Sequence, residues 1–153
     1  MSAVKITEGI YSVGIMNPNM RVFDIVMKTD SGTSYNSYLV RGSEKPALIE
    51  PCHESFFEEY LENIKEVCKF EEIDYIVMNH NEPDHSGSLA KLLELIQEGC
   101  KKFALCHLSQ ENNTPALALQ TMFNTLGAAG VVPEKDCIVQ AQRRNEISPT
   151  LTF

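Results

Sequence analysis

The sequence is poor in the features that mark exported, membrane-spanning or nucleic-acid-binding proteins. None of its apolar runs approaches the roughly 20 residues that a membrane span needs, and MSAVKITEGIYSV lacks the apolar core of an export signal. Positive charge is scarce: 13 lysines and arginines stand against 21 aspartates and glutamates, a net charge of -8. This balance argues against a nucleic-acid backbone or an anionic membrane as the main partner.

The cysteines lack the spacings of a disulfide framework or a zinc ribbon. There are five, an odd number, and none forms a CxxC pair. We therefore expect reduced thiols and a cytoplasmic protein. With 153 residues, 43% of them hydrophobic and 22% charged, the chain has the composition of one globular domain spanning residues 1–153.

The periodicity of apolar residues predicts a mixed α/β (α+β) fold. Runs at residues 10–13, 22–27, 35–40 and 47–49 are separated by turn residues, which indicates an antiparallel meander. After residue 54, helical spacing over 55–70, 89–96 and 115–126 alternates with short buried strands at 73–78, 103–106 and 137–139. Asn112-Asn113-Thr114-Pro115 resembles a helix cap followed by proline in the first turn.

The most informative stretch is NHNEPDHSG, residues 79–87. It follows a buried strand and precedes a helix, the place where α/β sheets present ligands. In an extended chain His80, Glu82 and Asp84 project to one side, and His85 follows at the turn. Two imidazoles and two carboxylates without a thiolate suit iron or manganese at least as well as zinc.

A simpler interpretation is that Asp84 and Ser86 cap the helix while the histidines are solvated. Four potential ligands within six positions favour a metal site over this alternative. For His53, which follows the strand 47–49, capping of a helix start is favoured over ligation. Cys52 is predicted to be a packing residue rather than a nucleophile.

The pattern His80-x-Glu82-x-Asp84-His85 resembles the HxExDH signature of flavodiiron and oxygen-binding diiron proteins, within the metallo-β-lactamase superfamily. The usual zinc hydrolases of that superfamily have a histidine where this chain has Glu82. The likeness covers about residues 4–98 and includes ITEGIYSVGI, GTSYNSYLV, ALIEPC and DYIVMNHNEPDHSGSL. It implies a shortened metallo-β-lactamase-like αββα sandwich, with His80 and Glu82 on one iron, Asp84 on the second and His85 at or beside it.

From about residue 101 to 148 the resemblance changes. ALCHLSQENNTPALALQTMFNTLG and IVQAQRRNEIS look like the end of hydrolytic, exonuclease-like metallo-β-lactamase-fold proteins. In those proteins the histidine of His-Leu-Ser is the last metal ligand, a role that would fall on His107. The chain thus resembles a chimera of a flavodiiron-like half, residues 1–100, and a hydrolase-like segment, residues 101–153, with truncation as an alternative.

The resemblance also identifies ligands that have no counterpart here. The family adds a middle histidine and a bridging aspartate, but no histidine follows His107, and Asp136 precedes a strand rather than ending one. No FMN-binding, flavodoxin-like domain is recognised in this chain.

Three functional hypotheses follow: a protein with one or two iron ions that binds or reduces O2 or NO, a hydrolase of phosphodiesters or esters using zinc or manganese, and a chimera with little catalysis. Nucleic acid is a partner only under the hydrolase hypothesis. Half of a sandwich leaves an apolar sheet face exposed, so we also expect a homodimer.

Overall fold

The computed structural model describes residues 2–23, 26–79, 83–95, 102–106 and 114–142. Its strands are β1 Val4–Thr7, β2 Ile10–Ser12, β3 Ile15–Asn17, β4 Val22–Phe23, β5 Met27–Lys28, β6 Thr33–Tyr35, β7 Tyr38–Arg41, β8 Pro46–Ile49, β9 Tyr75–Met78, β10 Lys102–Leu105 and β11 Ile138–Ala141. Its helices are η1 Glu54–Phe56, α1 Phe57–Lys65, η2 Phe70–Glu72, α2 Pro83–Ser86, α3 Leu89–Leu95 and α4 Pro115–Ala128.

The main sheet joins an antiparallel half to a parallel half. Its strand order is β1-β2-β7-β8-β9-β10-β11. Neighbours from β1 to β8 pair antiparallel, whereas β8, β9, β10 and β11 run parallel. The parallel half arises because a helical crossover returns the chain between successive strands, so that these four carboxyl ends share one edge.

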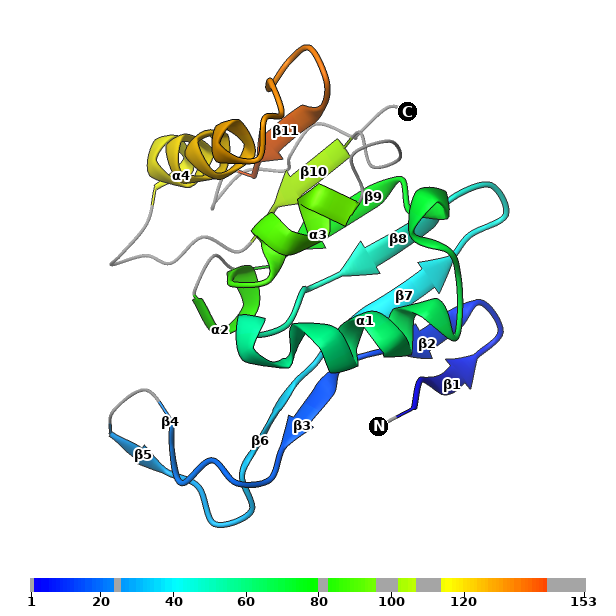
Figure 1. Cartoon of the computed structure of the whole chain (residues 1–153), viewed down its shortest axis with the longest axis vertical. Helices are drawn as coiled ribbons and strands as arrows, with labels where there is room; N and C mark the ends of the chain where they lie inside the picture. The colour runs from blue at the N-terminus through cyan, green and yellow to red at the C-terminus, as the bar shows by residue number, and fades with distance from the viewer. Residues whose placement is uncertain (1, 24–25, 80–82, 96–101, 107–113, 143–153) are drawn as a thin grey trace.

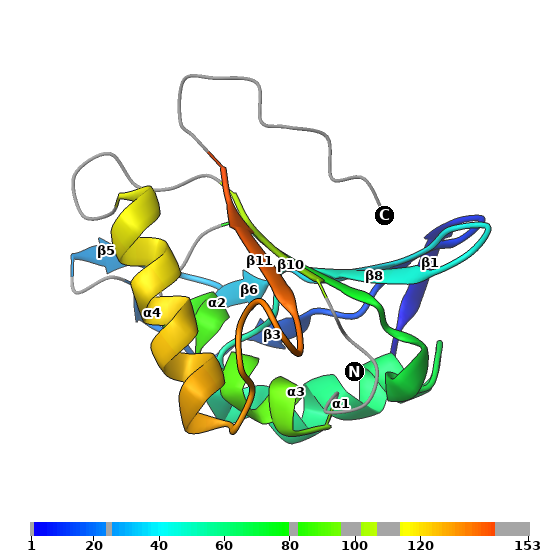
Figure 2. The same ribbon diagram turned by 90° about the horizontal axis from the view of Figure 1, so that it is seen from above.

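The helices cover one face of this sheet. Figures 1 and 2 show α1, α3 and α4 on the same side, with the β3–β6 and β4–β5 hairpins forming an arm at one end. The core lies between sheet and helices, where Leu39, Leu48 and Ile76 are fully buried against Tyr60 and Ile64 of α1. The helical spacing of α1 explains this contact, because its acidic residues fall on the opposite, exposed face.

The predicted run at residues 35–40 is wrong as a single strand. Tyr35 ends β6, which pairs with β3, and Tyr38 begins β7, which pairs with β2. Ser37 lies between them, fully buried, and its hydroxyl contacts Tyr60 Oη at 2.8 Å and donates to Ile49 O at 3.2 Å. These side-chain bonds fix the point where the chain passes from the arm into the main sheet.

The run at residues 22–27 is also wrong as a single strand. Phe23 pairs with Met27, so the chain reverses between β4 and β5. The apolar side chains of Val22 and Met27 are about half exposed, at 50% and 57%. The apolar spacing of this run therefore reflects pairing between β4 and β5 within the arm, and the side chains of Val22 and Met27 do not lie in the core.

The remaining predictions of element type and the mixed α/β class are confirmed, but the bounds differ: α1 is shorter than the predicted helix 55–70, whereas β8, β11 and α4 are longer than predicted. Within the described residues, no helix is long and apolar enough to cross a membrane.

Candidate metal centre

The predicted ligands follow the carboxyl ends of β9 and β10 in sequence, but most of them lie outside the described residues. This applies to His80, Glu82 and His107. Of Asp84 the structure describes the backbone, which lies in α2. His85, in the same short helix, is described with its side chain.

The register of the sheet shows where the two halves of the predicted ligand set begin. Met78, the last residue of β9, is the partner of Leu105, the last residue of β10. The pairing continues one step further, because the Cys106 N–H donates to Met78 O at 2.7 Å. His80 and His107 each follow these paired strand ends by two residues, so both sequence segments leave the sheet from neighbouring positions.

His85 is held in a defined orientation by the backbone after β8. Its Nδ1 lies 3.0 Å from Pro51 O, and its side chain is only 13% exposed. Since a carbonyl oxygen only accepts, Nδ1 carries the hydrogen, which leaves the lone pair of a neutral imidazole on Nε2. A backbone carbonyl that fixes one ring nitrogen is the usual support of a metal-binding histidine, so this residue fits the predicted role.

Glu50 is a component of the site that the sequence did not single out. It follows β8 directly and is only 6% exposed. Its Oε2 accepts the Asn79 N–H at 2.9 Å, and its Oε1 lies 3.9 Å from His85 Nδ1. One carboxylate thus contacts both ends of the predicted ligand loop, residues 79–85.

The backbone at Glu50 is unusual as well. Its φ is 59°, in the left-handed region that residues with a side chain seldom adopt. Such conformations persist where the surroundings over-determine them, and they gather at functional sites. The available sequence signal was an acidic residue directly after the buried run Ala47–Ile49 and before Pro51, a place where a strand end meets the ligand edge.

Aromatic rings close the side of the site that faces the arm. Tyr35 is 2% exposed, and its ring lies 6.1 Å from the His85 ring in an edge-on arrangement. His53 also packs against Tyr35, with 5.6 Å between ring centroids. The His53 side chain accepts the Ser55 N–H at 3.1 Å and so caps η1, which confirms the predicted capping role.

Cys52 lies in the core beside this site and not in a reactive position. It is fully buried, and burial raises the pKa of its thiol to about 12, against the smaller opposing effect of a hydrogen bond with Ser88. A thiol with such a pKa carries almost no thiolate at neutral pH. The structure therefore supports the packing role.

Among the described residues, no group of three or more histidine, cysteine, aspartate or glutamate side chains is arranged to hold a metal ion. The ligand set of His80, Glu82, Asp84, His85 and His107 thus remains a prediction, with the described part supplying His85, its support from Pro51 and the Glu50 tether.

The chain is similar to one protein named as a flavo-diiron protein and to another named as a nitric oxide reductase. Flavo-diiron protein FprA2 of Clostridium acetobutylicum is 59% identical over 95 residues, 62% of this chain and 24% of that protein. The nitric oxide reductase of Moorella thermoacetica is 40% identical over 93 residues, 60% of this chain and 23% of that protein.

A solved structure gives a similar result. Rubredoxin oxygen:oxidoreductase from Desulfovibrio gigas superposes with a TM-score of 0.71 at 31% identity, covering 95% of this chain and 32% of that chain. This chain therefore spans between 23% and 32% of the length of these relatives.

A family model described as "ODP family beta lactamase" matches residues 33–114. The match contains the whole predicted ligand set, from His80 to His107, together with Glu50. It also extends beyond residue 100, where the sequence resemblance to flavodiiron proteins was predicted to stop. Because the match spans more than half of the chain, the protein belongs to the ODP family beta lactamase group.

Proposed function

We propose that this protein binds metal in the manner of diiron proteins that bind or reduce O2 or NO. Its ligands would be His80, Glu82, Asp84, His85 and His107, around one or two iron ions. The observation that carries the proposal is the fixed orientation of His85 by Pro51 O, beside the buried Glu50, at the edge where β9 and β10 end. The identity to flavodiiron relatives supports the choice of iron.

Residues of this chain would have two separate roles at the site: some would hold the metal ligands in position, and others would shield them from water. His85 donates its Nδ1 hydrogen to Pro51 O and presents Nε2 to the metal, and Glu50 holds the loop at Asn79. Tyr35 packs edge-on against the His85 ring and keeps bulk water from that side. Iron, when bound, would supply one-electron redox chemistry and the affinity for a diatomic gas.

Catalysis by a pair of metals would need ligands beyond these five residues. The bridging aspartate and the middle histidine implied by the resemblance have no counterpart in the sequence, and a pair of metals needs a complete ligand shell to stay at fixed separation. We infer that the chain binds metal more effectively than it reduces gases. An oxidoreductase reaction on O2 or NO belongs to the whole-protein activity of relatives of which this chain spans only a part.

We also infer that the chain is a chimera that folds as one domain, with a flavodiiron-like segment, residues 1–100, and an exonuclease-like segment, residues 101–153. The support for one domain is that β10 and β11 continue the sheet of β8 and β9 in register. A single cooperative unfolding transition, seen alike by far-ultraviolet circular dichroism and tyrosine fluorescence, is expected. Two separate transitions would contradict the single domain.

The deciding experiment is metal analysis of protein purified without oxygen. We expect iron, at about two ions per chain if the site is complete, with an absorption band that changes on exposure to O2 or NO. The His85→Ala variant should lose at least half of the bound iron. His53→Ala is the matched control, because His53 packs against the same Tyr35 ring but caps η1, and its iron content should equal that of the wild type.

Three other results of these measurements would contradict the iron proposal or the role of His85 in it. Stoichiometric zinc or manganese with phosphodiesterase or esterase activity would replace the iron proposal by the hydrolase, in which a metal-bound water attacks the ester. Substoichiometric amounts of every metal would leave a folded chain without a working site. Equal iron content in the wild type and His85→Ala would remove His85 from the ligand set.

We further propose that the protein is a homodimer; in the part of the chain that the structure describes, helices cover one face of the main sheet (Figure 2).

A further inference from the structure

Glu50 and Pro51 support the predicted ligand loop from one turn after β8. The Glu50 carboxylate accepts the Asn79 N–H at 2.9 Å, and the Pro51 carbonyl oxygen lies 3.0 Å from His85 Nδ1. Both contacts depend on how the chain turns at Glu50, because the backbone angles of that residue direct its own side chain and the carbonyl group that follows. The conformation of Glu50 therefore determines both contacts with the loop.

That conformation is costly for a residue with a side chain. The φ of Glu50 is 59°, and in the left-handed region Cβ comes close to the following carbonyl oxygen. The next residue is Pro51, and a proline favours an extended conformation in the residue before it. Strained backbone of this kind persists only where its surroundings hold it. The turn must therefore be stabilised by its contacts.

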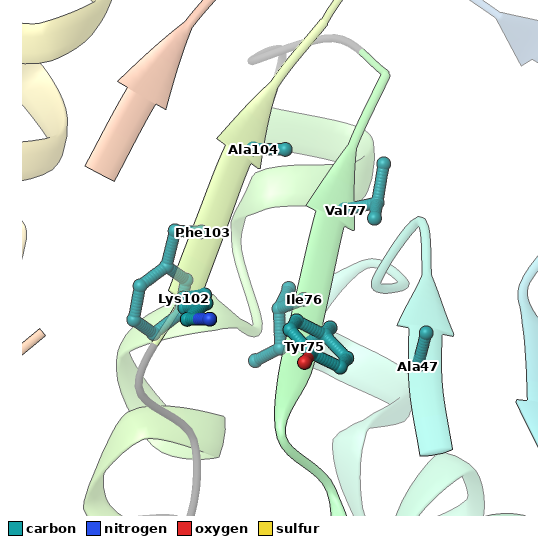
Figure 3. Close-up of a pocket in the computed structure, with 7 residues that line it drawn as sticks. All are labelled: Ala47, Tyr75, Ile76, Val77, Lys102, Phe103 and Ala104. Carbon is teal, nitrogen blue, oxygen red and sulfur yellow. The ribbon is translucent and has the colours of Figure 1, made fainter. Parts of the chain in front are cut away.

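The peptide group that joins Ile49 to Glu50 is fixed at both ends. On one side the Glu50 N–H donates to Val77 O at 2.8 Å. Figure 3 shows Val77 on β9, between β8 and β10, in the wall of an apolar cavity. On the other side the Ser37 hydroxyl donates to Ile49 O at 3.2 Å. Rotation of this peptide group toward an ordinary φ would break both bonds, so together they hold the left-handed turn.

Ser37 is itself held by α1. It is fully buried between β6 and β7, and its Oγ lies 2.8 Å from Tyr60 Oη. Since the single hydroxyl hydrogen of Ser37 goes to Ile49 O, the Tyr60 hydroxyl is the donor in this contact. Tyr60 is fully buried as well. The hydrogen bonds thus run in one direction, from α1 through Ser37 to the peptide group before Glu50.

We propose that Ser37, oriented by Tyr60, is a positioning residue of the candidate metal centre. It holds the peptide group before Glu50 in the orientation that the left-handed turn needs, and this turn supports the predicted ligand loop at Asn79 and His85. In this role Ser37 acts through Glu50. Its effect on metal binding rests on the proposed function, whereas its effect on the turn concerns the protein without metal.

Amide hydrogen exchange of the full chain without metal tests the turn. In Ser37→Ala the Asn79 N–H should exchange about tenfold faster, relative to the slowest amides of the main sheet, as expected for the loss of one supporting hydrogen bond. The slowest amides report global unfolding, so this ratio isolates the local change. Ser37→Thr keeps a hydroxyl at the position and should keep the slow exchange of Asn79.

Ile64→Val is the matched control. Ile64 is fully buried on α1, one turn after Tyr60, and losing one of its buried methyl groups lowers stability by an amount similar to a lost hydrogen bond. It leaves the hydrogen bonds to Ser37 intact. The exchange of Asn79 relative to the slowest amides should therefore equal that of the wild type.

Equal acceleration at Asn79 in Ser37→Ala and Ile64→Val would overturn the proposal, since a general loss of stability would explain both. An unchanged rate in Ser37→Ala, shown to be folded by circular dichroism, would overturn it too. Tyr60→Phe serves as a second variant if Ser37→Ala does not fold, because it keeps the ring in the core and removes only the hydroxyl. Asn79 should exchange faster in Tyr60→Phe than in Ile64→Val, and an equal rate would contradict the role of Ser37.

Anaerobic titration with ferrous iron separates this inference from the proposed function. If the wild type binds iron, Ser37→Ala should bind it about tenfold more weakly than Ile64→Val, as for other residues that support metal ligands. Equal affinity of the two variants would overturn the positioning role. A wild type that binds no iron would contradict the proposed function, and the exchange of Asn79 would then decide the role of Ser37 in the turn.

Discussion

Glu50 connects three parts of the site through one buried side chain. It directly follows β8, accepts the Asn79 N–H just after β9 and lies 3.9 Å from the His85 ring nitrogen. Its carboxylate therefore orders the start of the predicted ligand loop before any metal binds. The acceptor in this contact is a buried side chain, where a hydrogen bond is electrostatically stronger than in water.

Replacing Glu50 should therefore destabilise the fold and loosen the loop. We expect Glu50→Ala to lower the free energy of unfolding by about 1 kcal/mol, the net contribution of the hydrogen bond from Asn79 that it removes. Glu50→Gln keeps an oxygen for Asn79 and should lose less. Urea unfolding measures both, with Glu58→Ala on the exposed face of α1 as the control. Equal stability of Glu50→Ala and the wild type would contradict the tether.

Cys52 provides a pH-dependent prediction at the same scale. The pKa of its buried thiol is about 12, above the ordinary value of 9.0, so between these pH values the unfolded chain loses a proton that the folded chain keeps. The folded state binds more protons in this window, and stability falls as the pH rises. Below pH 9 both states are protonated and the stability is fully present.

Between pH 8.5 and 10.5 the wild type should lose about 1–2 kcal/mol more of its unfolding free energy than Cys52→Ala. Urea unfolding at the two pH values measures this difference, in which the contributions of other thiols and tyrosines cancel. Parallel pH dependences of the two proteins would show that the Cys52 thiol ionises as readily in the folded state.

At the scale of elements, α4 shows how far local signals determine the structure. Thr114 adopts an extended conformation, and its side chain accepts the Leu117 N–H at 3.2 Å, with Pro115 in the first turn. This is the cap predicted from Asn112-Asn113-Thr114-Pro115. Such a cap is predictable because all its groups lie within four residues of one another.

The Thr114→Ala variant should lower the unfolding free energy by about 1 kcal/mol, because a helix N–H group loses its side-chain acceptor. Thermal unfolding of the variant measures the loss. Gln120→Ala, an exposed substitution in the middle of the same helix, should change the stability by less than about 0.5 kcal/mol. A similar loss in both variants would indicate a general effect on the helix and not a cap.

At the scale of the whole molecule, metal binding at the predicted site would be coupled to the fold. The predicted ligands come from the loop after β9, from α2 and from the segment after β10, so a bound metal would connect segments that are distant in sequence. A ligand that binds only the folded state stabilises it according to its concentration relative to the dissociation constant.

Ferrous iron added without oxygen should accordingly raise the unfolding free energy, by about 2.7 kcal/mol at a hundredfold excess over the dissociation constant. Differential scanning fluorimetry in an anaerobic chamber measures the shift. His85→Ala should reduce it, whereas His53→Ala should leave it unchanged. An identical shift in both variants would mean that iron binds elsewhere on the chain.

The sequence by itself determined the element types, the cap of α4, the capping role of His53 and the cluster that identifies the candidate centre. All of these depend on residues close together in the chain, where spacing alone fixes geometry. Only the tertiary structure decided that the run 35–40 divides at Ser37, because the partners of that serine, Tyr60 and Ile49, are distant in sequence. It also decided the role of Glu50, which depends on which strands become neighbours, because many pairings satisfy one periodicity.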